Sequence, residues 1–135
     1  MSSWKHITGE NMERSIDELI ELLNDKDDFV VEDAVGELEL RADEAVDPLI
    51  DALSHRKKQI RLNAATLLGA INNPKAIPAL IETLEDEDWR VRGAAAWALG
   101  NIGDEKAIPA LEKLLDDESG FVKQGAQSAI KSINK

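Results

Sequence analysis

Residues 88–115 read DWRVRGAAAWALGNIGDEKAIPALEKLL, and two earlier stretches of the chain follow the same pattern. They are KQIRLNAATLLGAINNPKAIPALIETL at residues 58–84 and DFVVEDAVGELELRADEAVDPLIDAL at residues 28–53. One apolar column of this alignment, which recurs about every 31 residues, contains Val30, Ile60, Val91 and Val122. A repeat of this length indicates a solenoid, in which each unit buries its apolar surface against its neighbours.

Each unit is predicted to form two helices, A and B, joined by a tight turn. In the third repeat, apolar residues recur at helical spacing over 91–102 and again over 107–115. Between these stripes, Gly103 suits the left-handed end of one helix and Asp104 can cap the next. The Asn-Asn-Pro segment at 72–74 provides the same helix stop and start in the second repeat.

The fold class indicated by this pattern is an all-α solenoid, an α-α superhelix of about four stacked helical hairpins with the helix order B0, A1-B1, A2-B2, A3-B3, A4. An N-terminal segment, 1–10, is expected to be flexible, and 11–135 is expected to form one repeat domain. Its expected parts are B0 at 11–24, repeat one at 25–54, repeat two at 55–85, repeat three at 86–116 and a half repeat at 117–135.

The composition restricts the possible functions. The chain has 135 residues, no cysteine and a formal net charge of −11. Residues 10–54 contain 16 acidic and three basic residues, so nearly all of the negative charge lies in the first third. This balance disfavours nucleic acid as a partner, because such binding depends on cationic contacts to phosphate. No apolar run approaches the roughly 20 residues of a membrane helix, and we expect a cytoplasmic protein.

The segment VRGAAAWALGNIGDEKAIPALEKLL at residues 91–115 resembles the short HEAT-like repeat of the phycobilin-lyase type. The resemblance extends over the chain from about residue 13. Repeat one departs from it, because Glu39 stands in the column of Gly100 and Val31 in that of Arg92. The resemblance implies a solenoid that binds other proteins or, in some members, holds a cofactor, with the B helices along the concave side.

Enzymatic activity is not expected. The chain has two histidines, His6 and His55, and neither has metal-ligand spacing to other residues. Some HEAT-like proteins are di-iron hydroxylases with repeated His-Glu pairs, whereas neither histidine here is followed by glutamate. We therefore expect no catalytic residues, no metal and no cofactor.

Six carboxylates are the candidate partner-binding residues. They are spaced i, i+4, i+8 on B0 and again on B1, with an offset of 30 residues between the two rows. The six are Glu13, Asp17, Glu21, Asp43, Asp47 and Asp51. Like charges at this spacing repel one another, so the rows favour a protein partner with a basic surface. Two alternatives are a solvated face without a partner, and a chaperone that holds a cofactor or an immature subunit in the concave groove.

Four apolar residues are candidates for hydrophobic contacts: Trp89, Trp97, Ile130 and Ile133. The two tryptophans suit either a binding surface or packing across a repeat junction. The isoleucines belong to the apolar stripe of A4, which no B4 helix follows in this sequence, so a weak homodimer through the C-terminal face is one expectation.

Three expectations concern the internal structure. Basic residues one position after the core column are expected to form contacts between repeats, and these residues are Arg61, Arg92 and Lys123. Aspartates before the A helices are expected to cap them, and these are Asp25, Asp86 and Asp117. Repeat one is expected to be the least stable, because its A helix contains Gly36 and many acidic residues.

Overall fold

The computed structural model describes residues 14–135, and all regular secondary structure in that range is helical. The A helices are α2 (Asp28–Leu40), α4 (Lys58–Ile71), α6 (Trp89–Ile102) and α8 (Gly120–Ile133). The B helices are α1 (Ile16–Glu21), α3 (Ala42–Ala52), α5 (Ile77–Thr83) and α7 (Ile108–Lys113). In the described range, four short 3₁₀ turns extend three of the B helices. The turn η2 (Leu22–Asn24) follows α1, η3 (Pro74–Ala76) precedes α5, and η4 (Glu105–Ala107) and η5 (Leu114–Asp116) lie before and after α7. The predicted fold and helix order are confirmed.

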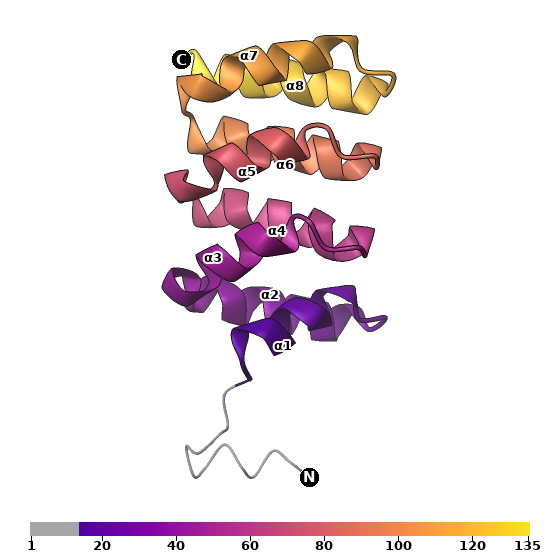
Figure 1. Ribbon diagram of the computed structural model, residues 1–135, viewed down its shortest axis with the longest axis vertical. Helices are drawn as coiled ribbons and strands as arrows, with labels where there is room; N and C mark the ends of the chain where they lie inside the picture. Colours follow the sequence, from indigo (N-terminus) through magenta and orange to yellow (C-terminus); the bar gives the residue numbers. More distant parts are fainter. Residues whose placement is uncertain (1–13) are drawn as a thin grey trace.

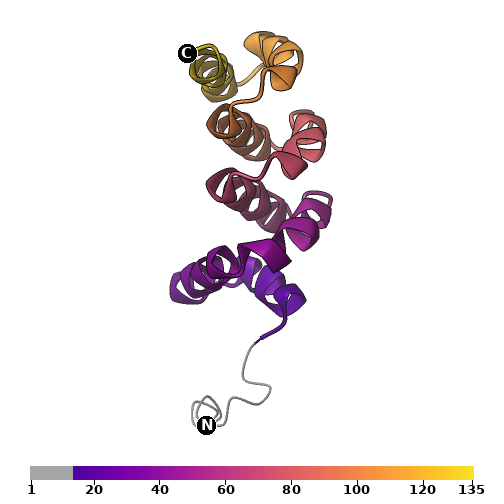
Figure 2. The same cartoon turned by 90° about the vertical axis from the view of Figure 1, so that its left-hand side faces the viewer.

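The helices form two layers along one axis (Figure 1). Figure 2 shows the A helices on one side of the stack and the B helices on the other. The core lies between the layers and consists mainly of leucine and alanine. Its fully buried leucines include Leu38, Leu68, Leu99, Leu49, Leu80 and Leu111. Each comes from a repeating apolar column, so the sequence period sets the composition of the core.

The turns between A and B helices follow the sequence prediction. Gly103 has a φ of 84° and Asn72 a φ of 63°, which are left-handed values. The side chains of Asn73 and Asp104 then accept hydrogen bonds from backbone N–H groups two residues later. In repeat one the turn is reduced to Arg41 between α2 and α3.

The expected caps of the A helices need a correction. The N-cap side chains that accept backbone hydrogen bonds are those of Asp27, Asp88 and Ser119. The predicted aspartates lie two residues earlier, where each accepts a hydrogen bond from the N–H of the N-cap residue itself: Asp25, Asp86 and Asp117. In repeat two, His55 takes this place and accepts from the Lys57 N–H through Nδ1 at 3.0 Å.

Successive A helices approach closely at glycine. A Cβ atom added to Gly69 would lie 2.8 Å from the Cα of Ala98, and one added to Gly100 would lie 2.8 Å from the Cα of Ala129. Real Cβ atoms do not approach backbone that closely. Glycine in this column therefore allows α4 to pack on α6, and α6 on α8, at backbone contact distance.

Arginine–aspartate bridges join the same helices to the following loops. Arg61 donates to Asp86 through Nε at 2.8 Å and Nη2 at 3.1 Å, and Arg92 donates to Asp117 through the same atoms at 3.0 Å each. All four side chains are about 10% exposed. The remaining guanidinium nitrogen of each arginine donates to the loop of its own repeat. The predicted role of Arg61 and Arg92 between repeats is confirmed.

The first junction between repeats lacks both features. Glu39 and Leu67 replace the glycine and alanine, while Val31 and His55 replace the arginine and aspartate. As a result, α2 contacts α4 at few residues, whereas α6 contacts both α4 and α8 extensively. In Figure 2 the A helices α4, α6 and α8 lie one above another, and α2 lies at a different angle.

Helix α8 buries the apolar stripe that was expected to be uncovered. Val122, Ala126, Ala129 and Ile133 are all buried, and Ile130 is half-buried. The side of α8 that corresponds to the junction-forming side of α6 is polar and exposed: it carries Lys123, Gln127 and Lys131. The expected C-terminal homodimer therefore loses its physical basis, because the stripe that would have formed it packs within the chain.

No helix in residues 14–135 is both long and apolar enough to cross a membrane.

The order of opening can be tested by amide hydrogen exchange. We expect α2 to exchange faster than α6, because opening α2 breaks neither a glycine–alanine contact nor a buried ion pair. Mass spectrometry of peptides from 28–40 and 89–102 measures both helices in one experiment. Faster exchange in α6 would show that these contacts do not determine local stability.

Two glycine substitutions test the close approach of the helices. Gly100→Ala should lower the free energy of unfolding by about 1–3 kcal/mol, because the added methyl overlaps Ala129. Gly36→Ala is the matched control in α2, where nothing lies within 4 Å, and should raise it by about 0.5–1 kcal/mol. Urea denaturation measures both changes. Equal effects of the two substitutions would rule out backbone contact as the reason for glycine in this column.

The bridge to Asp117 should make stability depend on pH. Burial acts to raise the pKa of this carboxyl, but the hydrogen bonds from Arg92 and from the Ser119 N–H together lower it. The pKa of this carboxyl is therefore lower in the folded chain than in the unfolded chain, where it is about 3.9. The bridge stabilises the fold at pH values above that unfolded pKa, and the stabilisation is lost as the pH falls through the lower pKa of the folded chain. Asp117→Asn should therefore cost about 3 kcal/mol at pH 7 and much less in strong acid. Asp116→Asn, an exposed neighbour, serves as the control in urea titrations at both pH values.

Candidate functional site

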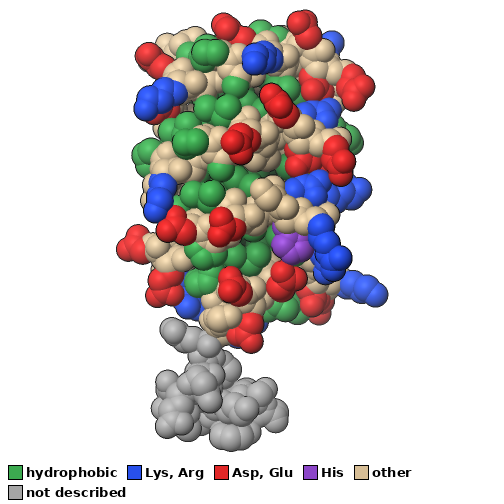
Figure 3. All heavy atoms as spheres, in the orientation of Figure 1, with side chains coloured by type: hydrophobic (Ala, Val, Ile, Leu, Met, Phe, Trp, Pro, Cys, Tyr) green, Lys and Arg blue, Asp and Glu red, His purple; other side chains and the backbone are tan. Residues whose placement is uncertain are grey.

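Five of the six predicted carboxylates lie in the described range, and all five are exposed on the B-helix layer. Asp17 and Glu21 come from α1, and Asp43, Asp47 and Asp51 come from α3. Glu13 lies outside the described residues. We call these five residues the acidic face. Figure 3 shows acidic side chains spread over the B-helix layer, with apolar side chains between them.

Two of these carboxylates pair with a basic side chain from repeat two. Glu21 Oε2 lies 3.0 Å from His55 Nε2, and Asp47 Oδ1 lies 2.8 Å from Lys75 Nζ. Because His55 Nδ1 accepts a backbone hydrogen bond, a neutral ring carries its proton on Nε2 and donates it to Glu21. Sequence spacing did not reveal either contact, since each one joins residues 28 or more positions apart.

The other three carboxylates keep their charge uncompensated. Asp17, Asp43 and Asp51 are exposed, and no ion pair within 4 Å involves any of them in residues 14–135. They come from two helices, α1 and α3, that pack against each other. The structure thus brings together the predicted rows but leaves three, not six, carboxylates available for a new ionic contact.

Basic side chains neutralise part of the charge on α2. Arg14 Nη2 donates to Asp33 at 2.8 Å and to Glu37 at 3.0 Å. These hydrogen bonds raise the pKa of Arg14, and the bond to Asp33 has the larger effect. Arg41 donates to Glu44 at 2.9 Å. Glu44 belongs to α3, so both layers are partly neutralised. Carboxylates without an ion pair within residues 14–135 include Asp28, Glu32 and Glu39 on α2, besides Asp17, Asp43 and Asp51 on α1 and α3.

The predicted tryptophans lie on the A-helix layer, on the opposite side from the acidic face. Trp97 packs its ring against the backbone of Gly69, and Trp89 contacts Phe121 edge to face, with ring centroids 5.3 Å apart and planes at 79°. Packing across repeat junctions, one of the two sequence interpretations, is confirmed. Both rings nevertheless remain 45–48% exposed. The sequence prediction missed Phe121, although the residue shares a column with the exposed Phe29.

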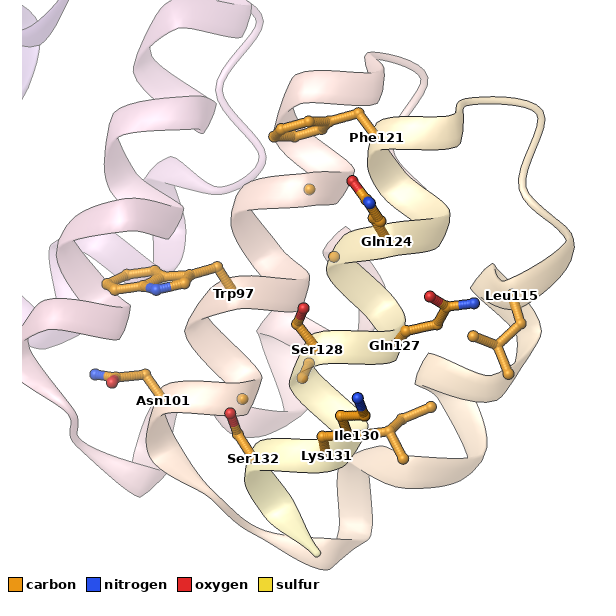
Figure 4. Close-up of a pocket in the computed structure, with 14 residues that line it drawn as sticks. Trp97, Asn101, Leu115, Phe121, Gln124, Gln127, Ser128, Ile130, Lys131 and Ser132 are labelled. Atoms are coloured by element: carbon orange, nitrogen blue, oxygen red, sulfur yellow. The ribbon is translucent and has the colours of Figure 1, made fainter. Parts of the chain in front are cut away.

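A groove of about 910 Å³ runs along α6 and α8 beside these rings. Its lining includes Trp97, Phe121, Gln124 and Ser128, and the Phe121 ring packs against Gly93. Figure 4 shows Trp97 and Phe121 on the same side of α8, and Leu115 and Ile130 on its other side. Of the two predicted isoleucines, Ile130 lines this groove, whereas Ile133 is buried and is not available for a partner.

Residues 14–135 contain no group of three or more His, Cys, Asp or Glu side chains that could hold a metal ion. The ring of His55 is hydrogen-bonded to the Lys57 N–H and to Glu21. His6 lies outside the described residues. The His-Glu pairs of di-iron HEAT-like hydroxylases have no counterpart, so the side chains present do not fit such a centre.

The family model for HEAT repeats matches residues 46–131. Among solved structures, human deoxyhypusine hydroxylase in complex with glycerol superposes with a TM-score of 0.71 at 25% identity, over 91% of this chain and 44% of that chain. The complex of CpcE and CpcF of phycocyanin lyase from Nostoc sp. gives a TM-score of 0.71 at 31% identity, over 92% of this chain and 55% of that chain. The chain thus spans about half the length of these two structures.

A designed armadillo repeat protein in complex with the peptide (KR)4 has the same fold, with a TM-score of 0.63 at 24% identity, over 86% of this chain and 63% of that chain. No curated protein matches the chain significantly in sequence.

Proposed function

We propose that this chain, which belongs to the HEAT repeat family, is a non-catalytic scaffold whose acidic face binds a basic surface of a partner protein. HEAT repeats typically serve as protein-interaction scaffolds. The observation that carries the proposal of an acidic binding face is the exposure of Asp17, Asp43 and Asp51 without an ion pair. Asp43 and Asp51 each lie four residues from Asp47 on α3, and like charges at this spacing repel one another.

A basic partner would relieve this repulsion and form charge-assisted contacts. Complementary charge mainly accelerates association and selects the partner, and apolar contacts supply much of the affinity. The B-helix layer provides both, because half-buried Ile50 and Ile81 lie near its acidic residues. The designed armadillo protein with (KR)4 shows that a solenoid of this fold can hold a strongly basic peptide.

A second candidate is a subunit of a two-chain assembly factor. The observation that favours it is the 31% identity to the CpcE–CpcF complex over 92% of this chain. In that structure one HEAT-type chain is bound to another protein chain. For the present protein, an absorbance band of a bound pigment after purification, or stable co-purification with a second helical-repeat chain, would support this function over the first.

The acidic face can be tested with the peptide (KR)4 as the probe. The triple variant Asp17→Lys, Asp43→Lys, Asp51→Lys should weaken binding about tenfold or more at low salt, since three attractive pairs become repulsive. Binding to the unchanged protein should fall as salt is added. Fluorescence anisotropy of the labelled peptide gives the Kd, and circular dichroism checks that the fold is kept.

The matched control changes the net charge by the same amount elsewhere. Glu39, Glu105 and Glu118 are exposed and lie outside α1 and α3, and their joint change to lysine should affect binding much less. If both triple variants lose affinity equally, only the net charge matters and the acidic face is not a specific site.

A further inference from the structure

The A helices of repeats two to four lack acidic residues entirely. No Asp or Glu occurs in α4, α6 or α8, whereas α2 alone contains Asp28, Glu32, Asp33, Glu37 and Glu39. Each of the three later helices carries two basic residues instead. For a chain with a net charge of −11, this is a strong separation of charge between α2 and the three later A helices.

Four of these six basic residues are exposed. Arg61 and Arg92 are buried in the bridges between repeats, and the exposed ones are Lys58, Arg90, Lys123 and Lys131. The large exposed aromatic side chains of α6 and α8 lie on the same helices: Trp89, Trp97 and Phe121. Lys58 and Arg90 both pair with Asp88, at 3.6 and 3.5 Å. Lys123 and Lys131 have no ion pair within residues 14–135, so the basic and partly apolar part of this layer is the surface of α8 and the adjoining rings of α6.

The groove along α6 and α8 concentrates these properties. Lys131 is its only charged lining residue, and no carboxylate lines it. Trp97 and Phe121 offer ring surface, while Gln124 and Ser128 are exposed and have no hydrogen-bond partner among residues 14–135. Such amide and hydroxyl groups can pair with the backbone of an extended peptide.

We infer that this groove is a second interaction surface, which binds an acidic peptide segment with an aromatic or aliphatic anchor residue. The anchor would contact the half-exposed ring of Trp97, and a neighbouring carboxylate would reach Lys131. Interfaces typically gain most of their affinity from a few such aromatic and basic residues. The segment would bind opposite the acidic face, so the scaffold could hold two partners of opposite charge at once.

The surroundings favour a peptide over a nucleic acid. Glu87 and Glu118 lie beside Trp89 and Phe121 in a smaller cavity of about 440 Å³ next to the groove. These carboxylates would repel a phosphate backbone that continued along the aromatic side chains. A short peptide can place its acidic residues near Lys131 and Lys123 without extending past Glu87 and Glu118.

The probe is a labelled synthetic peptide in which Glu and Asp alternate with Leu and Phe. The intact protein should bind it and should bind the same peptide with Lys in place of the acids far more weakly. Trp97→Ser should weaken binding of the acidic peptide about tenfold, and Lys131→Glu severalfold, because one removes ring contact and the other reverses the charge. Fluorescence anisotropy gives the Kd, and intrinsic tryptophan emission reports directly on the rings.

Two matched controls separate the groove from general effects. Leu40→Ser removes an 88% exposed apolar side chain from α2, and Lys106→Glu reverses an exposed charge in η4. Neither residue lines the groove, and both variants should bind the acidic peptide normally. Urea denaturation of Trp97→Ser, with Trp97→Phe as a conservative variant that should keep most of the affinity, distinguishes lost binding from lost stability.

Three results would overturn the inference. They are equal binding of the acidic and basic peptides, unchanged affinity in both Trp97→Ser and Lys131→Glu, and tighter binding of a single-stranded oligonucleotide with the same dependence on these residues. The test is independent of the acidic face, because the triple lysine variant of α1 and α3 should still bind the acidic peptide. If one of the two surfaces is shown not to bind its peptide, the proposal for the other surface is unaffected.

Discussion

Backbone contact between successive A helices is the constraint on which the rest of the structure depends. Gly69 against Ala98 and Gly100 against Ala129 leave no room for a larger side chain, and the bridges Arg61–Asp86 and Arg92–Asp117 fix the loops beside those contacts. A solenoid has no central core that could hold distant units together, so each junction must be stable by itself. The two features act together: the glycine sets the distance between helices, and the bridge sets their relative position along the axis.

The first junction, which has neither feature, is packed differently from the other two. With Glu39, Leu67, Val31 and His55 in the four positions, α2 contacts α4 at few residues and takes a different angle. The same repeat carries many acidic side chains without an ion pair, and it joins repeat two partly through the exposed pair of Asp47 and Lys75. The acidic side chains that repel one another and the sparse contact between α2 and α4 thus occur in the same third of the chain.

The two layers of the stack differ in chemistry as well as in position. Acidic residues gather on α1, α2 and α3, while α4, α6 and α8 carry basic residues, and α6 and α8 also carry exposed aromatic ones. On the later repeats the A layer is therefore free of acidic residues, whereas α5 and α7 of the B layer each carry one. A scaffold with two surfaces of opposite charge can discriminate between partners on each side. Family membership does not specify those partners, because a fold hosts many functions.

The sequence by itself determined the helices, their order and the turns, because these depend on interactions within a few residues: apolar spacing, the left-handed residues Asn72 and Gly103, and the caps that come after them. It also identified the acidic rows and the arginine column, since a repeat places equivalent residues in equivalent surroundings. Only the tertiary structure decided how the helices rotate and tilt on one another. That rotation buries Ile133, pairs Asp47 with Lys75, brings Trp89 to Phe121 and opens the groove beside Trp97. Such contacts join residues some 25 to 35 positions apart, and their geometry depends on the packing distance and angle at each junction, which no local pattern encodes.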